Sequence, residues 1–206
     1  MIGNLLDISR MEAGVMQYEL KSNDLTELVR AVTAEFQPLA AERELTIARA
    51  YPEQPMMIEC DGDRIMQIIR NLLGNAVKFS PKGKEIQIRM SATAQAPQGM
   101  PDSWRGKLPP LSEGREYALL EVADSGPGVP NLHKERIFEK FHQVKQGKKV
   151  PGQGAGLGLA ICKTIALAHH GAIWVEDNPK GGSIFCLVIP PGEGSGGVSY
   201  RASSPI

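Results

Sequence analysis

The segment 63–79, DRIMQIIRNLLGNAVKF, carries the strongest structural signal in the chain. Its apolar residues recur every three or four positions, the spacing that places side chains on one face of an α-helix. They are Ile65, Ile68, Ile69, Leu72, Ala76 and Phe79. The pattern predicts an amphipathic helix packed on a core, with Asp63 as its N-cap and the sequence SPKG at 80–83 as its end.

A polar stripe runs along the neighbouring face of this helix. Asn71, Asn75 and Lys78 follow one another at steps of four and three, so their side chains converge beside the core. An amide oxygen can coordinate Mg²⁺ without adding charge, and an ammonium group can contact a phosphate oxygen. The stripe therefore fits a ligand with both metal and phosphate character. An ordinary amphipathic helix with a polar margin has the same pattern, so the assignment depends on the rest of the chain.

Composition excludes several classes of protein. The chain has 206 residues, 42% of them hydrophobic, enough for one sizeable domain with extensions. Its 23 basic and 23 acidic residues balance, which gives no reason to expect nucleic acid or an anionic membrane as a partner. The sequence shows neither a signal peptide nor a membrane-spanning apolar run, and Cys60, Cys162 and Cys186 are expected to be reduced core residues. We expect a cytoplasmic domain, whether or not its parent protein is anchored in a membrane.

Two helices are predicted before the central one. Residues 1–17 have one narrow apolar seam, formed by Met1, Leu5, Ile8, Met11 and Val15. The seam fits a piece of a longer helical hairpin, and it fits equally well a simple helix lying on the domain. A second helix, at 24–39, follows from the capping pair Asp24 and Glu27, with Pro38 kinking it or ending its regular part.

The remaining pattern favours an α+β fold, a two-layer sandwich of a mixed β-sheet with helices on one face. Short extended segments predict strands at 45–47, 56–60, 86–90, 117–123, 172–176 and 183–189, and helices are expected at 135–141 and 158–170. The absence of regular βαβ alternation argues against a Rossmann fold, and the absence of GxxxxGK[ST] excludes a P-loop. Residues 94–115 are rich in Pro, Gly and Ser, and we expect an exposed connection without chemistry, with Trp104 isolated in it.

Asp124 stands where the strand 117–123 becomes the turn DSGPG. A carboxylate at this point can accept a hydrogen bond from the exocyclic amine of adenine. Gly126 and Gly128 would let the backbone approach the base closely. A plain hairpin turn has the same sequence features.

A glycine-rich segment, GQGAGLGL at 152–159, opens the helix predicted at 158–170. The free N–H groups and the dipole of a helix N-terminus favour a phosphate group. The basic stretch 143–153 before it could fold over a nucleotide as a lid, or it could be a mobile loop with solvated lysines. A third glycine motif, GGS at 181–183, precedes the last strand.

Taken in order, five features resemble one known family. The NxxxN helix, DxGxG, IFEKF at 137–141, GxGxGLGL and GGS follow one another as in the ATP-binding catalytic domain of bacterial sensor histidine kinases, within the GHKL superfamily. The resemblance covers roughly residues 1–190. The segment LLDISRMEAG resembles the end of the second helix of the dimerisation domain, which implies that 1–20 are the remnant of that helix and its linker. The family resemblance also implies that 21–190 are the catalytic domain with the Bergerat fold, and 191–206 are a flexible tail.

The same resemblance implies an ATP–Mg²⁺ site, with roles carried over by position. Asn71 and Asn75 match the two motif asparagines, Asn75 being the Mg²⁺ ligand, and Lys78 would contact phosphate. These three form the expected catalytic set. The other expected ATP-binding positions are Phe79 in the pocket wall, Asp124 at the adenine amine, Gly126 and Gly128 in its turn, Phe138 and Phe141 as lid anchors, Gly154, Gly156 and Gly158 at the phosphates, Leu157 beneath them, and Ser183 with Gly181 and Gly182 in the third glycine motif.

One departure from the family pattern concerns the phosphoacceptor. None of the four histidines, His133, His142, His169 and His170, stands in an HExxxP-like setting. The acceptor is therefore expected on a dimerisation domain outside these residues, with a response regulator receiver domain as the next partner and a homodimer as the intact protein. His169 and His170 end a predicted helix, where favourable contacts with its dipole are expected rather than a metal pair.

Two other functions fit the same motifs. A hydrolytic ATPase of the superfamily, such as gyrase or the mismatch-repair enzymes, has a glutamate four residues before the Mg²⁺-binding asparagine to activate water. Here that position is Asn71, which favours the kinase. A nucleotide-binding interaction module without phosphotransfer is the third hypothesis.

Overall fold

The computed structural model describes residues 9, 13, 16–51, 54–144 and 155–191. The elements in chain order are β1 (Lys21–Asp24), α2 (Leu25–Glu42), β2 (Thr46–Ala50), β3 (Met57–Cys60), α3 (Gly62–Phe79), β4 (Glu85–Thr93), α4 (Asp102–Arg105), β5 (Tyr117–Ala123), the 3₁₀ turns η1 (Asn131–His133) and η2 (Arg136–Phe138), α5 (Gly158–Ala168), β6 (Ala172–Asp177) and β7 (Ser183–Ile189). Within this part of the chain, no helix is both long and apolar enough to cross a membrane.

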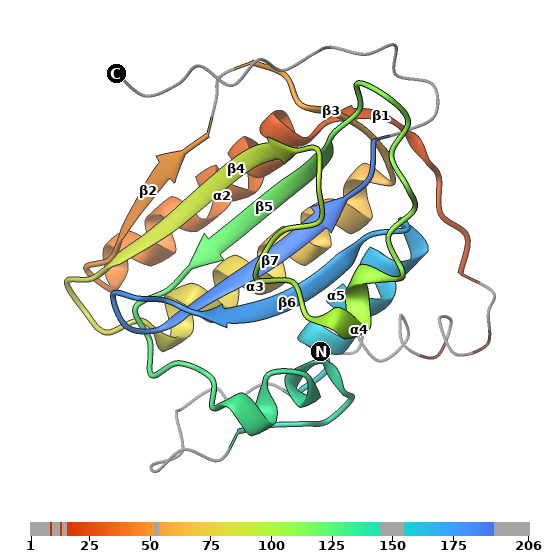
Figure 1. Ribbon diagram of the computed structural model, residues 1–206. Helices are drawn as coiled ribbons and strands as arrows, with labels where there is room; N and C mark the ends of the chain where they lie inside the picture. The colour runs from red at the N-terminus through yellow and green to blue at the C-terminus, as the bar shows by residue number, and fades with distance from the viewer. Residues whose placement is uncertain (1–8, 10–12, 14–15, 52–53, 145–154, 192–206) are drawn as a thin grey trace.

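The strands form a mixed five-stranded sheet in the order β2-β4-β5-β7-β6, and a separate two-stranded sheet of β1 and β3 (Figure 1). β2 runs parallel to β4, and every other neighbouring pair in the large sheet is antiparallel. The helices α2, α3 and α5 lie together behind this sheet in Figure 1. The predicted α+β fold is confirmed, with the helices α2, α3 and α5 on one face of the mixed sheet.

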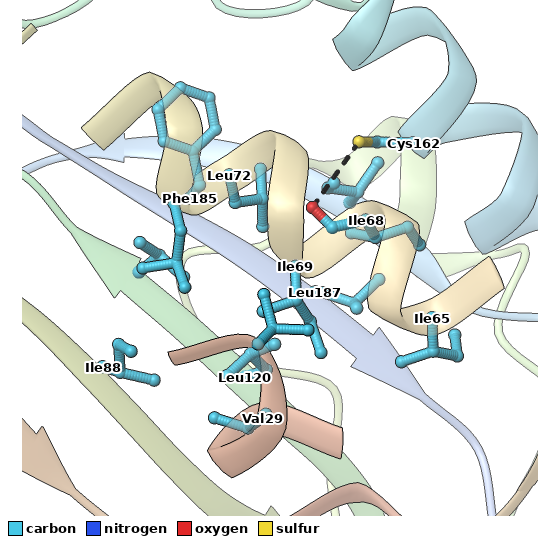
Figure 2. Close-up of a cluster of buried hydrophobic side chains, with 14 of the residues drawn as sticks. Val29, Ile65, Ile68, Ile69, Leu72, Ile88, Leu120, Cys162, Phe185 and Leu187 are labelled. Carbon is cyan, nitrogen blue, oxygen red and sulfur yellow. Dashed lines mark hydrogen bonds between the residues drawn. The ribbon is translucent and has the colours of Figure 1, made fainter. Parts of the chain in front are cut away.

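The main core lies between these helices and the sheet. Figure 2 shows Val29 of α2 and the apolar side of α3 facing strand residues such as Leu120 and Leu187, with Cys162 of α5 beside Ile68. All five of these side chains are buried. The apolar stripe predicted for α3 is buried here, except that Phe79 is partly exposed. Burial of each large side chain in this stripe contributes of order 1.5–3 kcal/mol to the free energy of folding. Packing rather than helix propensity therefore stabilises α3.

The opposite face of the sheet is also covered, and here the sequence-based expectation is wrong. The segment 94–115 is not a bare exposed connection, because it contains α4 and its Trp104 is only 7% exposed. Trp104 and Met100 pack with the outward-facing side chains of three strands in a second apolar cluster, which includes Tyr117, Ala123, Trp174, Ile184, Cys186 and Val188. The sheet therefore has apolar residues on both faces, and the segment 94–115 shields the second face from water.

Helix ends differ in detail from the prediction. Asp24 caps α2 as expected, and its Oδ1 accepts from the N–H of Thr26 at 2.9 Å. α2 then continues past Pro38 to Glu42, since Ala40 beyond the proline is buried in the main core and holds the last turn in place. α3 begins two residues earlier than predicted: Asp61, not Asp63, is the N-cap and accepts from the N–H of Arg64 at 3.2 Å.

The helix predicted at 135–141 is not formed. The structure has the single 3₁₀ turn η2 there instead, with η1 just before it, and within 135–141 only Ile137 and Phe138 are buried. The helix predicted at 1–17 lies mostly outside the described residues. Of its positions Ser9 is helical, and the N–H of Ala13 donates to the carbonyl of Ser9 at 3.0 Å, as within a helical turn.

Candidate functional site

Asp124 follows β5 directly, and its carboxylate is held by two backbone N–H groups. The N–H of Gly126 donates to Oδ1 at 2.7 Å, and the N–H of Ser183 donates to the same oxygen at 3.2 Å. The side chain is 5% exposed. Burial raises the pKa of the Asp124 carboxyl above its ordinary value, and the two N–H groups oppose this shift. The carboxylate is therefore fixed in one orientation by the protein backbone.

The turn between β6 and β7 supports Asp124 from behind. Asn178 donates from Nδ2 to the backbone carbonyl of Asp124 at 2.8 Å. Gly182 has a φ of 101°, and a Cβ built on it would lie 2.2 Å from that same carbonyl oxygen. Only glycine fits at this contact, since the conformation is left-handed and the space is filled. Asn178 was missed by the sequence analysis, and its one signal is its place as a turn former in the sequence NPKGG.

The end of α3 closes the same group of residues. A Cβ on Gly126 would come within 3.1 Å of the carbonyl oxygen of Phe79, so the turn after β5 packs tightly on the last residue of α3. Ser80, also missed from the sequence, accepts from the N–H of Ser125 through Oγ at 3.3 Å. Gly128, at a φ of 77°, lies against Gly182. The structure thus brings Phe79, Asp124, Gly126, Gly128 and Ser183 together.

A second group of residues lies where α3 meets the start of α5. Asn71 donates from Nδ2 to the carbonyl of Gly158 at 3.4 Å, and a Cβ on Gly158 would lie 3.0 Å from Asn71 Oδ1. Leu157 is buried in the main core. Gly156 has a φ of 71°, and its carbonyl accepts from the N–H of Phe141 at 3.0 Å.

Asn75 and Lys78 lie between these two groups on α3, and both side chains are half-buried. Partial burial lowers the pKa of Lys78, and the nearby charge of Arg43 adds to the shift. Arg43 itself donates from Nη1 to the carbonyls of Val77 and Lys78 at 3.1 and 3.3 Å, at the C-terminal end of α3. The ammonium of Lys78 lies 5.1 Å from the ring centroid of Phe79. From Asn71 to Phe79 the helix rises by about 12 Å, the span between the two groups.

One predicted position differs from expectation, and another lies outside the described residues. Phe138 is buried in the core, but Phe141 is 66% exposed with a φ of 61°, so the two rings do not share one buried side. The reason is that η2 ends at Phe138 and the chain after it is extended at Glu139, which turns Phe141 away from the core. Gly154 lies outside the described residues.

The described part of the chain has no group of three or more His, Cys, Asp or Glu residues that could hold a metal ion. A divalent ion beside α3 would therefore take an amide oxygen from the protein and its other ligands from water or from the ligand itself. Magnesium commonly binds in this way, with few protein ligands and several phosphate or water oxygens.

Comparison with known proteins places these features in a family. Residues 60–193 match the sequence profile of the histidine kinase-, DNA gyrase B-, and HSP90-like ATPases. The sensor histidine kinase TmoS of Ectopseudomonas mendocina is 34% identical over 189 residues, which are 92% of this chain and 17% of TmoS. The hybrid signal transduction histidine kinase D of Dictyostelium discoideum is 35% identical, again over 92% of this chain but 11% of that protein. The chain thus spans less than a fifth of the length of these two relatives.

Solved structures agree. The crystal structure of full-length ShkA in complex with AMPPNP superposes with a TM-score of 0.69 at 30% identity, covering 92% of this chain and 35% of that one. The catalytic domain of histidine kinase ThkA gives a TM-score of 0.61 at 25% identity and is covered over 95% of its length by 84% of this chain. Fold, motif order and profile lead to one conclusion: the chain belongs to the histidine kinase-, DNA gyrase B- and HSP90-like ATPase family and has the fold of a histidine kinase ATP-binding domain.

Proposed function

We propose that this domain binds ATP along the polar face of α3, with the adenine at Asp124 and the phosphates at the start of α5. The observation that carries the proposal is the fixed carboxylate of Asp124. Both backbone N–H groups donate to Oδ1, so we assign Oδ2 to the exocyclic amine of adenine. A guanine would present a carbonyl oxygen at this position, and two acceptors would repel, so the arrangement favours adenine over guanine.

The phosphates are assigned to the part of the stripe between Lys78 and the start of α5. Lys78 would contact a phosphate oxygen, and the N–H groups around Gly156 and Gly158, where α5 begins, would donate hydrogen bonds to phosphate oxygens, with Leu157 beneath them. Gly154 is proposed to join them, although it lies outside the described residues. Phe79 would form part of the wall at the adenine end. Phe138, which is buried in the main core, would anchor the lid.

We propose that the domain also binds Mg²⁺, and the residues present fit this ion. Asn75 offers a neutral amide oxygen between the adenine end and the phosphate end, which suits an ion whose other oxygens come from phosphate and water. The ion would neutralise the charge that develops on the transferred phosphoryl group. Asn75 would hold and orient it, while Lys78 would add a positive charge on the same side.

We further propose that the γ-phosphoryl group is transferred to a histidine and not to water. Asn71 occupies the place where the hydrolytic enzymes of the superfamily have a general base, and an amide does not accept a proton at neutral pH. In this structure its amide is occupied with the carbonyl of Gly158. An acceptor imidazole brings its own nucleophilic nitrogen, so the domain needs only to position ATP and neutralise its charge.

The acceptor histidine is proposed to lie on a helical dimerisation domain, with residues 1–20 as the end of that domain and its linker and 21–190 as the catalytic unit. The phosphoryl group would pass to a receiver-domain aspartate of a response regulator. The intact protein would be a homodimer with this domain in the cytoplasm. These proposals rest on relatives that are named as histidine kinases. The chain covers less than a fifth of the length of each of them.

A phosphotransfer assay separates the three functions. The chain is mixed with a histidine-bearing dimerisation domain and ATP labelled in the γ position. Label on the added domain supports the kinase. Free labelled phosphate alone would identify a hydrolytic ATPase, and ATP binding without either product would identify an interaction module.

A further inference from the structure

His133 and His142 form a pair that the nucleotide site does not use. His133 lies at the end of η1, and His142 follows the exposed Phe141, nine positions later. Nδ1 of His133 and Nε2 of His142 are 3.1 Å apart, with ring centroids separated by 5.2 Å and ring planes tilted by 40°. The two nitrogens come from separate turns of the chain. Both side chains are half-buried, so they remain within reach of solvent.

The separation of the two nitrogens suits a shared metal ion. Two imidazole ligands about 2.0–2.1 Å from one ion lie about 2.9 Å apart at a right angle and about 3.4 Å apart at the tetrahedral angle. The observed 3.1 Å falls between these limits. Imidazole is a preferred ligand of Zn²⁺, Ni²⁺ and Cu²⁺, whereas Mg²⁺ prefers oxygen.

We propose that His133 and His142 bind a divalent transition-metal ion, with Zn²⁺ as the representative case, and that the ion ties η1 to the backbone around Phe141. Water would fill its remaining positions, because the described residues offer no third His, Cys, Asp or Glu ligand at this point. The alternative is a simple N–H···N hydrogen bond between two neutral rings. The proposal concerns a site apart from Asp124 and Asn75, and it does not depend on ATP binding.

The position of the pair gives the ion a structural effect. His142 adjoins Phe141, whose N–H donates to the carbonyl of Gly156, and a Cβ on Gly156 would touch the carbonyl of His142 at 3.0 Å. On the other side, Lys134 next to His133 pairs with Asp177 of β6 at 2.7 Å. An ion between the rings would therefore link the backbone that precedes α5 to the segment held on β6.

The test is a calorimetric titration of the untagged chain with ZnCl₂ in the presence of excess Mg²⁺. We expect one Zn²⁺ site per chain, and a loss of affinity of about tenfold or more in His133→Ala and in His142→Ala. The melting temperature should rise with Zn²⁺ concentration in the unaltered chain and not in these variants.

Two further variants separate metal binding from other effects. His142→Gln keeps a polar group near Nδ1 of His133 but supplies a poor ligand for Zn²⁺, so it should lose Zn²⁺ affinity while its melting temperature without metal stays near that of the unaltered chain. His170→Asn is the matched control: His170 is exposed with a φ of 54°, which asparagine tolerates, and Zn²⁺ binding should be unchanged. Absence of Zn²⁺ binding, or equal binding in all four variants, would overturn the proposal.

Discussion

The backbone N–H of Asp61 donates a hydrogen bond to Nε2 of His169 at 3.0 Å, joining the N-cap of α3 to the C-cap of α5. Since Nε2 accepts, the proton of the neutral ring is on Nδ1, which donates to the carbonyl of Ile165 at 2.8 Å. His169 is buried and packs edge-on against Tyr18. The bond to Ile165 is a favourable contact with the C-terminal end of α5, of the kind predicted from the sequence, and the accepting Nε2 identifies the ring of His169 as neutral.

This relationship predicts a loss of stability in mild acid. Burial lowers the pKa of His169 from its ordinary value of 6.5, so the unfolded chain takes up a proton at a higher pH than the folded chain does. The stabilisation is complete above about pH 6.5 and is lost as the pH falls below it, by at most about 1.4 kcal/mol per pH unit. Urea unfolding between pH 7.5 and 5.5 measures the effect.

Replacement of the histidine supplies the comparison. In His169→Gln the unfolding free energy should fall less between pH 7.5 and 5.5. His170→Asn, at the exposed neighbour, should keep most of the pH dependence, because burial contributes more than the charge of His170 to the lowered pKa of His169. If His169→Gln and the unaltered chain showed the same pH dependence, the buried neutral state of His169 would be refuted.

Asp124→Asn tests the proposed adenine contact with little structural change. Asparagine keeps an oxygen for the N–H groups of Gly126 and Ser183, and it replaces the second oxygen with an amide NH₂ group, a donor that repels the donor N–H of the adenine amine. We expect ATP affinity to fall about tenfold or more, since a hydrogen bond to a charged group is worth about 1.5–3 kcal/mol. Calorimetric titration with ATP gives the value, with the fully exposed Asp102→Asn as control. Unchanged affinity in Asp124→Asn contradicts the adenine role.

Asn75→Ala tests the proposed Mg²⁺ ligand. The side chain is half-buried on the polar face of α3, and alanine favours a helix, so the fold should survive. We expect ATP binding in this variant to lose its dependence on Mg²⁺, measured by titrations with and without the ion. If Mg²⁺ strengthened ATP binding as much as before, Asn75 would be removed from the metal site.

Gly182→Ala and Gly181→Ala form a matched pair of substitutions in one turn. Both glycines have positive φ, at 101° and 91°, so alanine is strained at each by of order 1–3 kcal/mol. Only at Gly182 would the new Cβ also collide, 2.2 Å from the carbonyl oxygen of Asp124, while nothing lies within 4 Å at Gly181. Chemical denaturation should show the larger destabilisation for Gly182→Ala, and ATP affinity should fall in that variant alone. Equal effects on both properties would mean that the contact with Asp124 is not important.

Trp104→Ala tests the cover on the second face of the sheet. Removal of a buried tryptophan costs about 3–5 kcal/mol, because the cluster around Met100 and Trp174 loses one of its two largest members. Guanidinium unfolding should report this loss, while Leu132→Ala, at a side chain that is 86% exposed, should leave stability nearly unchanged. A loss below about 1 kcal/mol for Trp104→Ala would show that the segment 94–115 does not stabilise the sheet.

Long periodic segments were predicted well from the sequence. The apolar runs of β5 and β7 gave both ends of each strand, and the periodicity of α3 gave its extent to within two residues, since burial on a fixed face leaves a regular pattern. The residue contacts of the Asp124 turn were partly predictable, because its glycines mark close backbone approaches. Asn178 was not, since a turn former in a glycine-rich turn has no spacing that points to a distant carboxylate.

Composition misled the prediction where tertiary contacts decide. The Pro, Gly and Ser content of 94–115 resembles that of an exposed loop, yet a few apolar residues spaced along it find partners on β6 and β7. Similarly, two aspartates flank Gly62, and the choice of Asp61 as the cap depends on its contact with His169, which is 108 positions away.

The turn 178–182 has a consequence beyond its contact with Asp124. β7 reads SIFCLVI, with all seven residues buried, so it has no polar alternation to distinguish its two faces. A shift of β7 by one position would exchange one apolar face for another. The two registers would therefore differ little in the apolar surface that they expose to water. Selection of the correct alignment then depends on the hairpin bend itself, where Asp177 is paired with Ser183. A substitution that disrupts this turn would shift the register of β7, an inner strand of the sheet, and would also disturb the carboxylate of Asp124.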